Sequence, residues 1–327
     1  MSNRYQAFIE EFEKWDTIAL TAPAGADGDS VGTQCALKEY FNSCYPNKTV
    51  RIINEDPCPA RYRFLRESTY FEVSEQIKGP SPELWICVDG GPNRLGDHTT
   101  ELWKQAKRKA QIDHHAFSSC DLPVDIDIND DQAASTTEIL FHFFNSIDFK
   151  MSPSVAEALY VGLVYDTGLF KHSNTTPEVM RMGASLLECG FDHTSAAEKT
   201  LMIKNEASLK LLNRLINRIK FVNRGRYVWS QLQQQDFKEC GAVTDDREGL
   251  IDALFLTPHC LVATLFYEVG ENDWKISFRS RAPNVAELAK SLDPNGGGHV
   301  LASGCRLQGS QEEVIKRAND AALKLIS

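Results

Sequence analysis

The stretch that decides the fold is TIALTAPAGADGDSVGTQCALKEYF, residues 17–41. It begins with a short apolar run, 17–22, which predicts a buried strand. A turn-rich loop, 23–29, follows, and Asp29 or Ser30 then caps a helix that runs to about Phe41. This order of strand, loop and helix starts an alternation that continues along the chain.

Strand-like runs recur at 49–54, 84–89 and 110–113, with helical stretches between them and after them. The alternation predicts a mainly parallel sheet flanked by helices. An apolar stripe over 206–221 predicts the helix that leads into a second, smaller α/β domain. We therefore expect one domain at 1–195, a linker helix at 196–222 and a second domain at 223–327.

Length and composition support two soluble globular domains. The chain has 327 residues, too many for one ordinary core, and its 42% hydrophobic and 24% charged residues exclude disorder and low-complexity architecture. The longest apolar run, around 261–267, is far shorter than the roughly 18 residues of a membrane span, so no membrane partner is expected. Nine scattered cysteines without a CxxC pair predict reduced thiols and a cytoplasmic location.

The net charge is −10, from 35 Lys and Arg against 45 Asp and Glu. Binding to long duplex nucleic acid depends on neutralising many phosphates, so the charge argues against such a partner. Short anionic substrates remain compatible with it where positive charge is concentrated locally, for instance by metal ions.

Acidic residues and histidines recur at the ends of predicted elements. They form four short motifs: Asp27-Gly28-Asp29, Asp89-Gly90-Gly91, Asp113-His114-His115 and Asp166-Thr167-Gly168. Ligands of open α/β sheets gather outside the carboxyl ends of the strands, so residues far apart in sequence can meet there. Carboxylates with one or two imidazoles suit Mn²⁺ or Mg²⁺ better than metals that seek thiolates. Each motif alone is a common turn or helix end, but the four together predict a metal site.

In this order, and with Leu169-Phe170 after the last of them, the four motifs resemble those of the DHH phosphoesterases. Near the C-terminus, Arg279-Ser280 and Gly296-Gly297-Gly298-His299 resemble the associated DHHA1 domain. The resemblance extends from about residue 5 to 325 and is strongest to the nano-RNase and pAp-phosphatase type. It implies a DHH domain and a smaller α/β DHHA1 domain that face each other across a cleft. It also implies a centre of two Mn²⁺ ions in the DHH domain, with Mg²⁺ as the alternative ion.

The resemblance further implies roles for six of the acidic and histidine residues in these motifs. Asp27 would bind the first metal and Asp89 would bridge the two. The second metal would be completed by three residues: Asp29, His114 and Asp166. His115 would contact the substrate phosphate or assist protonation of the leaving group. In the DHHA1 domain the terminal phosphate or phosphodiester would be held by Arg279 and His299 beside Ser280, where Gly297 and Gly298 let the backbone approach closely.

One position departs from the family pattern. The family's first loop opens with a metal-ligating histidine four residues before the first aspartate, and here that position is Pro23. No histidine precedes His98, so no sequence neighbour replaces it. Either the first site is weaker, or water or a distant residue fills the gap. Arg94 follows Asp89 closely, and we expect it to be a solvated loop arginine.

The function implied by the resemblance is metal-dependent hydrolysis of short oligonucleotides or dinucleotides, or of the 3′-phosphate of adenosine bisphosphate (pAp). A cyclic dinucleotide phosphodiesterase is an open alternative. So is a nucleotide-binding sensor without catalysis, which the missing histidine at Pro23 motivates. The expected partners are short single-stranded nucleotides or dinucleotides and a second copy in a homodimer.

Overall fold

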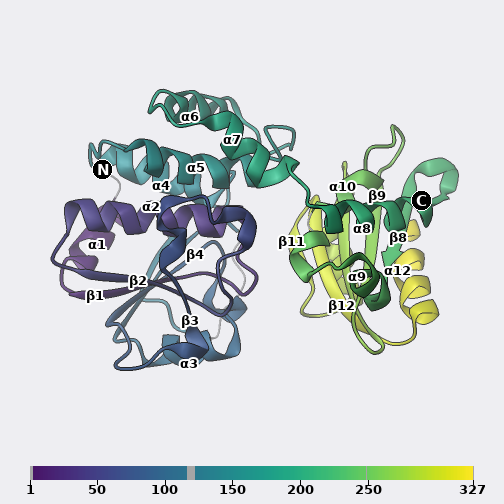
Figure 1. Cartoon of the computed structure of the whole chain (residues 1–327), viewed down its shortest axis with the longest axis horizontal. Helices are drawn as coiled ribbons and strands as arrows, with labels where there is room; N and C mark the ends of the chain where they lie inside the picture. The colour runs from purple at the N-terminus through teal and green to yellow at the C-terminus, as the bar shows by residue number, and fades with distance from the viewer. Residues whose placement is uncertain (1–2, 116–121, 248, 327) are drawn as a thin grey trace. The chain divides into compact units, whose positions relative to one another are not determined.

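The computed structural model describes residues 3–115, 122–247 and 249–326, and Figure 1 shows the chain. The chain divides into two compact units, Met1–Ile203 and Lys204–Ser327, each of which is described by itself.

The sheet of the first unit is entirely parallel and has the strand order β3-β2-β1-β4-β5-β6. Its strands are β1 (Thr17–Thr21), β2 (Thr49–Asn54), β3 (Phe71–Val73), β4 (Leu84–Val88), β5 (Arg108–Asp113) and β6 (Ile126–Asn129). The order reverses between β1 and β4, and such a reversal opens a crevice at the carboxyl ends of the strands. The expectation of a parallel sheet is confirmed, and β3 and β6 extend it beyond the strands expected from the sequence.

Helices cover both faces of this sheet, as parallel sheets require. They are α1 (Asn3–Phe12), α2 (Gly28–Cys44), α3 (Asp97–Gln105), α4 (Thr136–Ser146), α5 (Pro153–Asp166), α6 (Pro177–Leu187) and α7 (His193–Ala197). Alternate strand residues such as Ile18 and Leu20 pack with α1, α2, α4 and α5, whereas Ala19 and Trp85 pack on the other face with Trp103 of α3. Figure 1 shows α3 on the side of the sheet away from α1, α2, α4 and α5.

Two helices beside the crevice approach each other unusually closely. A Cβ added to Gly32 of α2 would collide with the carbonyl oxygen of Ala158 in α5, and one added to Gly28 would lie 2.8 Å from Cγ of Tyr165. Small residues therefore allow α2 and α5 to pack backbone against backbone.

The segment 196–222 is not the single linker helix that the sequence suggested. A π-helical turn, Glu198–Met202, follows α7, residues 203–205 are non-helical, and α8 (Glu206–Asn217) gives way to strand β7 (Lys220–Val222). The apolar stripe of α8 packs Leu211 and Leu215 into the core of the second unit. The domain boundaries drawn from the sequence stay a prediction.

The second unit has a mixed sheet of order β11-β12-β10-β9-β8-β7, with only β8 and β9 parallel among its described neighbours. The remaining strands are β8 (Tyr227–Leu232), β9 (Val262–Gly270), β10 (Asp273–Ser280), β11 (Gly297–His299) and β12 (Ala302–Gln308). One face packs against α8, α9 (Gln234–Cys240) and α10 (Ile251–Leu254), and the other packs against α11 (Val285–Leu292) and α12 (Gln311–Leu325). This confirms the expected second α/β unit.

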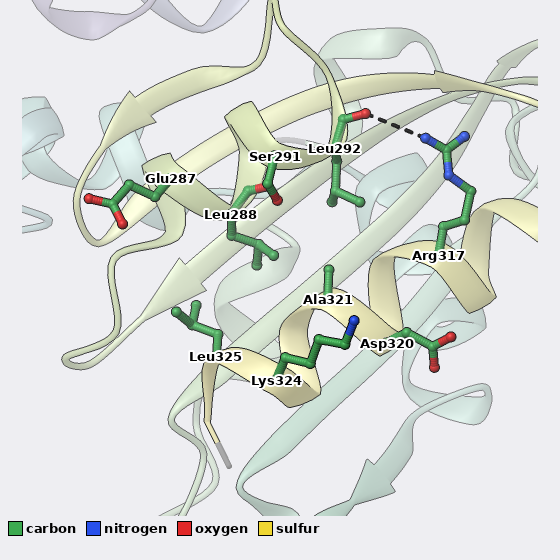
Figure 2. A pocket seen from close by; sticks show the side chains of 9 residues that line it. All are labelled: Glu287, Leu288, Ser291, Leu292, Arg317, Asp320, Ala321, Lys324 and Leu325. Atoms are coloured by element: carbon green, nitrogen blue, oxygen red, sulfur yellow. Dashed lines mark hydrogen bonds between the residues drawn. The ribbon is translucent and has the colours of Figure 1, made fainter.

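A surface cavity of about 640 Å³ lies between α11 and α12. Figure 2 shows its apolar lining by Leu288, Leu292 and Leu325, with Arg317 donating to the Leu292 carbonyl oxygen at 3.5 Å. It lies on the sheet face that carries Phe278, opposite to the face of Arg279, so it is separate from Arg279.

No helix in the described parts of the chain is both long and apolar enough to cross a bilayer.

Candidate metal and phosphate site

Loops after β1, β4 and β5 bring the predicted acidic residues together at the crevice. Because these three strands are neighbours and parallel, their carboxyl ends share one edge of the sheet. Asp27 follows β1, Asp89 follows β4, and Asp113 ends β5 directly before His114. Asp166 comes from the C-terminal end of α5, which packs on α2.

Asp27 is half-buried and caps α2. Its Oδ1 accepts the backbone N–H groups of Asp29 at 3.0 Å and Ser30 at 3.2 Å. Burial and the nearby charges of Asp89 and Asp166 raise the pKa of Asp27 well above its usual range. Its second carboxylate oxygen stays available to a ligand that supplies positive charge.

Asp29 is fully buried and is held by the first turn of α4. Its Oδ2 accepts the backbone N–H of Thr136 at 2.6 Å and its Oδ1 that of Thr137 at 3.0 Å. The N-terminal end of a helix favours negative charge, so α4 orients this carboxylate toward the site. Gly162 of α5 lies against the same group, and a Cβ there would come within 2.5 Å of Asp29 Oδ1.

Asp89 lies at the centre of the cluster. Its backbone is left-handed, with φ of 60°, and its Oδ2 accepts a 2.5 Å hydrogen bond from the Ser30 hydroxyl. Oδ1 lies 3.4 Å from the Thr136 hydroxyl and 3.5 Å from His114 Nε2. Burial alone would raise the pKa of Asp89, but the hydrogen bonds and positive charge of His114, with Ser30, lower it well below its usual range.

His114 shows that the cluster needs a cation. Its Nδ1 lies 3.2 Å from the Ala133 carbonyl oxygen and so carries the proton in the neutral ring. Its Nε2 then offers a lone pair, yet carboxylate oxygens surround it at 3.1 Å (Asp166), 3.5 Å (Asp89) and 3.9 Å (Asp29). Lone pairs converge this closely only around a proton or a metal ion. Burial lowers the pKa of His114, but Asp166 and Asp89 outweigh it and raise that pKa well above its usual range.

The donor set fits a divalent metal ion. Asp29, His114 and Asp166 each offer one ligand atom, and these atoms lie within 4.8 Å of one another. Carboxylate oxygens with one imidazole suit Mn²⁺ or Mg²⁺, and the carbonyl oxygen behind His114 fixes its ring as metal-binding histidines require.

His115 is oriented by a residue to which the sequence analysis gave no role. Asp113 Oδ1 lies 2.8 Å from His115 Nδ1 and accepts the His115 backbone N–H at 3.1 Å. Asp89, Asp113 and His115 also offer ligand atoms within 4.8 Å of one another. The DHH motif therefore contributes two histidines with different surroundings: His114 faces the carboxylates, and His115 is paired with Asp113.

The turn after Asp166 is strained. Gly168, Leu169 and Phe170 all have φ between 56° and 61°, an unfavourable conformation for the two non-glycine residues. The carbonyl oxygen of Asp166 is held by His172 Nδ1 at 2.9 Å and Asn174 Nδ2 at 3.3 Å. These side chains were not predicted to have a role, because no motif marks residues that act through a main-chain carbonyl.

In the second unit, Arg279 and His299 lie in one row of the sheet. Ala302 pairs with Arg279 on one side and with His299 on the other, and residues directly opposite each other point to the same face. The small side chain of Ala302 separates the two basic residues. Arg279 is half-buried, and its Nε lies 3.7 Å from Asp252 Oδ1.

The other predicted residues of this unit occupy different positions. Gly297 lies on the same face as His299, and nothing lies within 4 Å of a Cβ added there. Gly298 has φ of 132°, and a Cβ there would lie 2.7 Å from the Ala302 carbonyl oxygen, so glycine is required. Ser280 alternates to the opposite face from Arg279 and accepts the Ala282 N–H at 3.2 Å.

Comparisons with known proteins identify the family of each unit. Residues 17–163 match the family described as DHH family, N-terminal domain, and residues 239–327 match the DHHA1 domain. A Bacillus subtilis (strain 168) protein named bifunctional oligoribonuclease and PAP phosphatase NrnA is 22% identical over 302 residues, which cover 91% of this chain and 92% of the relative. A Mycoplasma pneumoniae protein with the same name is 26% identical over 318 residues, 95% of this chain and 94% of the relative.

The fold also matches a solved structure. The crystal structure of an exopolyphosphatase-related protein from Bacteroides fragilis superposes with a TM-score of 0.89 at 23% identity, covering 99% of this chain and 96% of that one. The two family domains occupy the two units in the expected order. The chain therefore belongs to the DHH phosphoesterase family, with the DHH domain in its N-terminal unit and the DHHA1 domain in its C-terminal unit.

Proposed function

We propose that this phosphoesterase uses divalent metal ions, Mn²⁺ in the first place, to hydrolyse short oligoribonucleotides or dinucleotides and the 3′-phosphate of pAp. The observation that carries the proposal is the convergence of three carboxylates on His114 Nε2. The printed activities of the B. subtilis and M. pneumoniae relatives, oligoribonuclease and PAP phosphatase, support the substrate class.

The metal ligands we propose are those named from the sequence: Asp27, Asp29, Asp89, His114 and Asp166. Bound divalent ions would lower the pKa of a water molecule and neutralise phosphoryl oxygens. Asp89, which lies between the Ser30 and His114 side chains, is the proposed bridging ligand. Asp113 accepts from His115 Nδ1 and thereby leaves His115 Nε2 as the ring atom that can contact the substrate phosphate.

The terminal phosphate of the substrate is proposed to bind in the second unit, at the row of Arg279 and His299. Arginine presents a planar fork that matches phosphate bidentately. In the absence of substrate, the carboxylate of Asp252 lies 3.7 Å from Arg279 Nε and partly balances its charge.

The decisive experiment is a substrate panel with the purified full chain and Mn²⁺. The panel contains pAp, a linear dinucleotide and a cyclic dinucleotide, and release of phosphate or mononucleotide is followed with and without EDTA. We expect metal-dependent hydrolysis of pAp and the linear dinucleotide. Preferred cleavage of the cyclic substrate would instead indicate a cyclic dinucleotide phosphodiesterase, and tight binding without turnover would indicate a sensor.

Asp89→Asn should reduce turnover to background, because the carboxamide keeps the left-handed backbone but loses the charge of the bridging ligand. The matched control is Asp148→Asn, since Asp148 also has a positive φ, 53°, but lies at the end of α4 away from the cluster. Near-normal turnover in a folded Asp89→Asn protein would contradict the metal mechanism.

A further inference from the structure

The first metal position lacks a ligand on the side of Pro23. Pro23 is buried, and its Cγ lies 2.8 Å from the position of a Cβ added to Gly90. Its ring carries no donor atom, so it cannot bind a metal in place of the histidine of the family pattern. Asp27 contributes one carboxylate oxygen to the cap of α2, which leaves this position poorer in ligands than the one at His114.

A second side chain packs on Gly90 beside Pro23. Arg94 Nη1 lies 3.1 Å and Arg94 Cδ 3.7 Å from the same added Cβ. Gly90 directly follows Asp89, so the guanidinium lies over the residue next to the proposed bridging ligand. In the described part of the chain, the Arg94 side chain forms no hydrogen bond or ion pair.

The backbone around Arg94 is fixed even though its side chain is exposed. Arg94 ends the 3-10 turn Pro92–Arg94, and its carbonyl oxygen accepts the backbone N–H of Ala24 at 3.1 Å. This bond ties the loop after β4 to the loop after β1, directly beside Pro23. The guanidinium therefore lies beside Pro23 and over Gly90, the residue that follows Asp89.

Resting on the function proposed above, we infer that Arg94 supplies positive charge to the substrate phosphoryl group on the Pro23 side of the site. Two features of this side of the site belong together. Pro23 stands where the family pattern has a metal-binding histidine, and the unpaired guanidinium of Arg94 packs on Gly90 beside it. A guanidinium is permanently charged and binds phosphate oxygens through paired N–H donors, so it can perform the charge-neutralising part of a metal ion's role. It cannot lower the pKa of a water molecule, so that part of the role would belong to the metal ion bound at His114.

The inference predicts the metal content of the full chain. Equilibrium dialysis against Mn²⁺ with metal analysis should give one tightly bound ion per chain, and Pro23→His should add a second. Arg94→Gln should leave the tight ion in place, because Arg94 contributes no ligand atom. Two equally tight ions in the unmodified protein would overturn the inference.

The phosphate role is tested by binding of AMP, the product expected from pAp, to the Mn²⁺-loaded chain by calorimetry. Arg94→Gln should weaken AMP binding about tenfold or more, as expected for loss of a charge-assisted hydrogen bond, and Arg94→Lys should restore part of it. The control is Arg63→Gln, which removes an exposed arginine on another loop of the same unit. Unchanged AMP affinity in Arg94→Gln, or no AMP binding by the unmodified chain, would contradict the inference.

These outcomes are distinguishable from failure of the proposed function. If the chain hydrolyses neither pAp nor a dinucleotide but AMP binding still depends on Arg94, the inference stands and the substrate proposal falls. If hydrolysis occurs and Arg94→Gln binds AMP normally, the function stands and the role of Arg94 falls.

Discussion

The hydroxyl of Ser30 donates a 2.5 Å hydrogen bond to Oδ2 of Asp89, a residue 59 positions away in sequence. Ser30 lies in the first turn of α2, so the helix that begins at the Asp27 cap also orients the central carboxylate of the cluster.

Ser30→Ala should therefore weaken Mn²⁺ binding about tenfold to a hundredfold, because residues that orient metal ligands typically contribute this much. Mn²⁺ titration of the full chain measures the effect. Ser146→Ala removes a hydroxyl at the far end of α4 and serves as the control. Equal Mn²⁺ affinities in the two variants would show that Asp89 does not depend on Ser30.

Gly162→Ala should destabilise the protein although alanine is the better helix former. The new methyl group would collide with the Thr137 methyl group and lie within 2.5 Å of Asp29 Oδ1. Overpacking of this kind costs about 1–3 kcal/mol, and displacement of Asp29 should also weaken metal binding. Urea denaturation and Mn²⁺ titration measure the two effects.

Gly183→Ala, in α6, is the comparison for Gly162→Ala, since only the ring of Phe170 lies near its added Cβ, at 3.3 Å. Equal stability of the two variants would mean that α5 can move away from Asp29 at little cost.

Glu55 should make stability depend on pH below about 4. Its carboxylate accepts the backbone N–H and the hydroxyl of Thr99, both at 2.9 Å, and so caps α3 from a distant loop. Burial alone would raise the pKa of Glu55, but the hydrogen bonds of Thr99 and His98 lower it to about 2. Since this lies below the unfolded value of about 4.3, the contribution is complete above that pH and is lost as the pH falls toward 2.

Glu55→Gln should therefore lower the free energy of unfolding by about 1 kcal/mol at pH 7, as for loss of a helix cap, and by less at pH 3. Urea denaturation at the two pH values measures this difference, with Glu75→Gln, an exposed neighbour, as the control. If Glu55→Gln lowered the free energy of unfolding by the same amount at pH 7 and at pH 3, the role of the Glu55 carboxylate as a cap of α3 would be contradicted.

Arg279→Ala should raise KM for pAp about tenfold with little change in kcat, provided that the guanidinium contacts ground state and transition state equally. Mn²⁺ affinity should not change. Arg317→Ala, on the opposite face of the same sheet, is the control. Identical KM values for Arg279→Ala and Arg317→Ala would show that the terminal phosphate of the substrate does not bind at Arg279.

Much of the fold followed from local patterns. The strands 49–54 and 84–88 lie where apolar runs predicted them, because a parallel strand buried on both faces is mostly apolar. The strand expected at 110–113 begins two residues earlier, at Arg108. β3 was missed because it is three residues long and half-buried. The expected helix over 206–221 was too long, because pairing of β7 with β8 takes its last residues into the sheet.

The sequence by itself determined which residues carry the chemistry, since carboxylates, histidines and glycines at element ends form motifs that can be read locally. Only the tertiary structure decided how they are oriented. Thr136 and Thr137 hold Asp29, Asp113 holds His115, and Arg94 packs on Gly90 beside Pro23. The pairing of Asp113 with His115 and the packing of Arg94 on Gly90 are local, but the other contacts join segments that meet only when parallel strands align their carboxyl ends, so no local pattern encodes them.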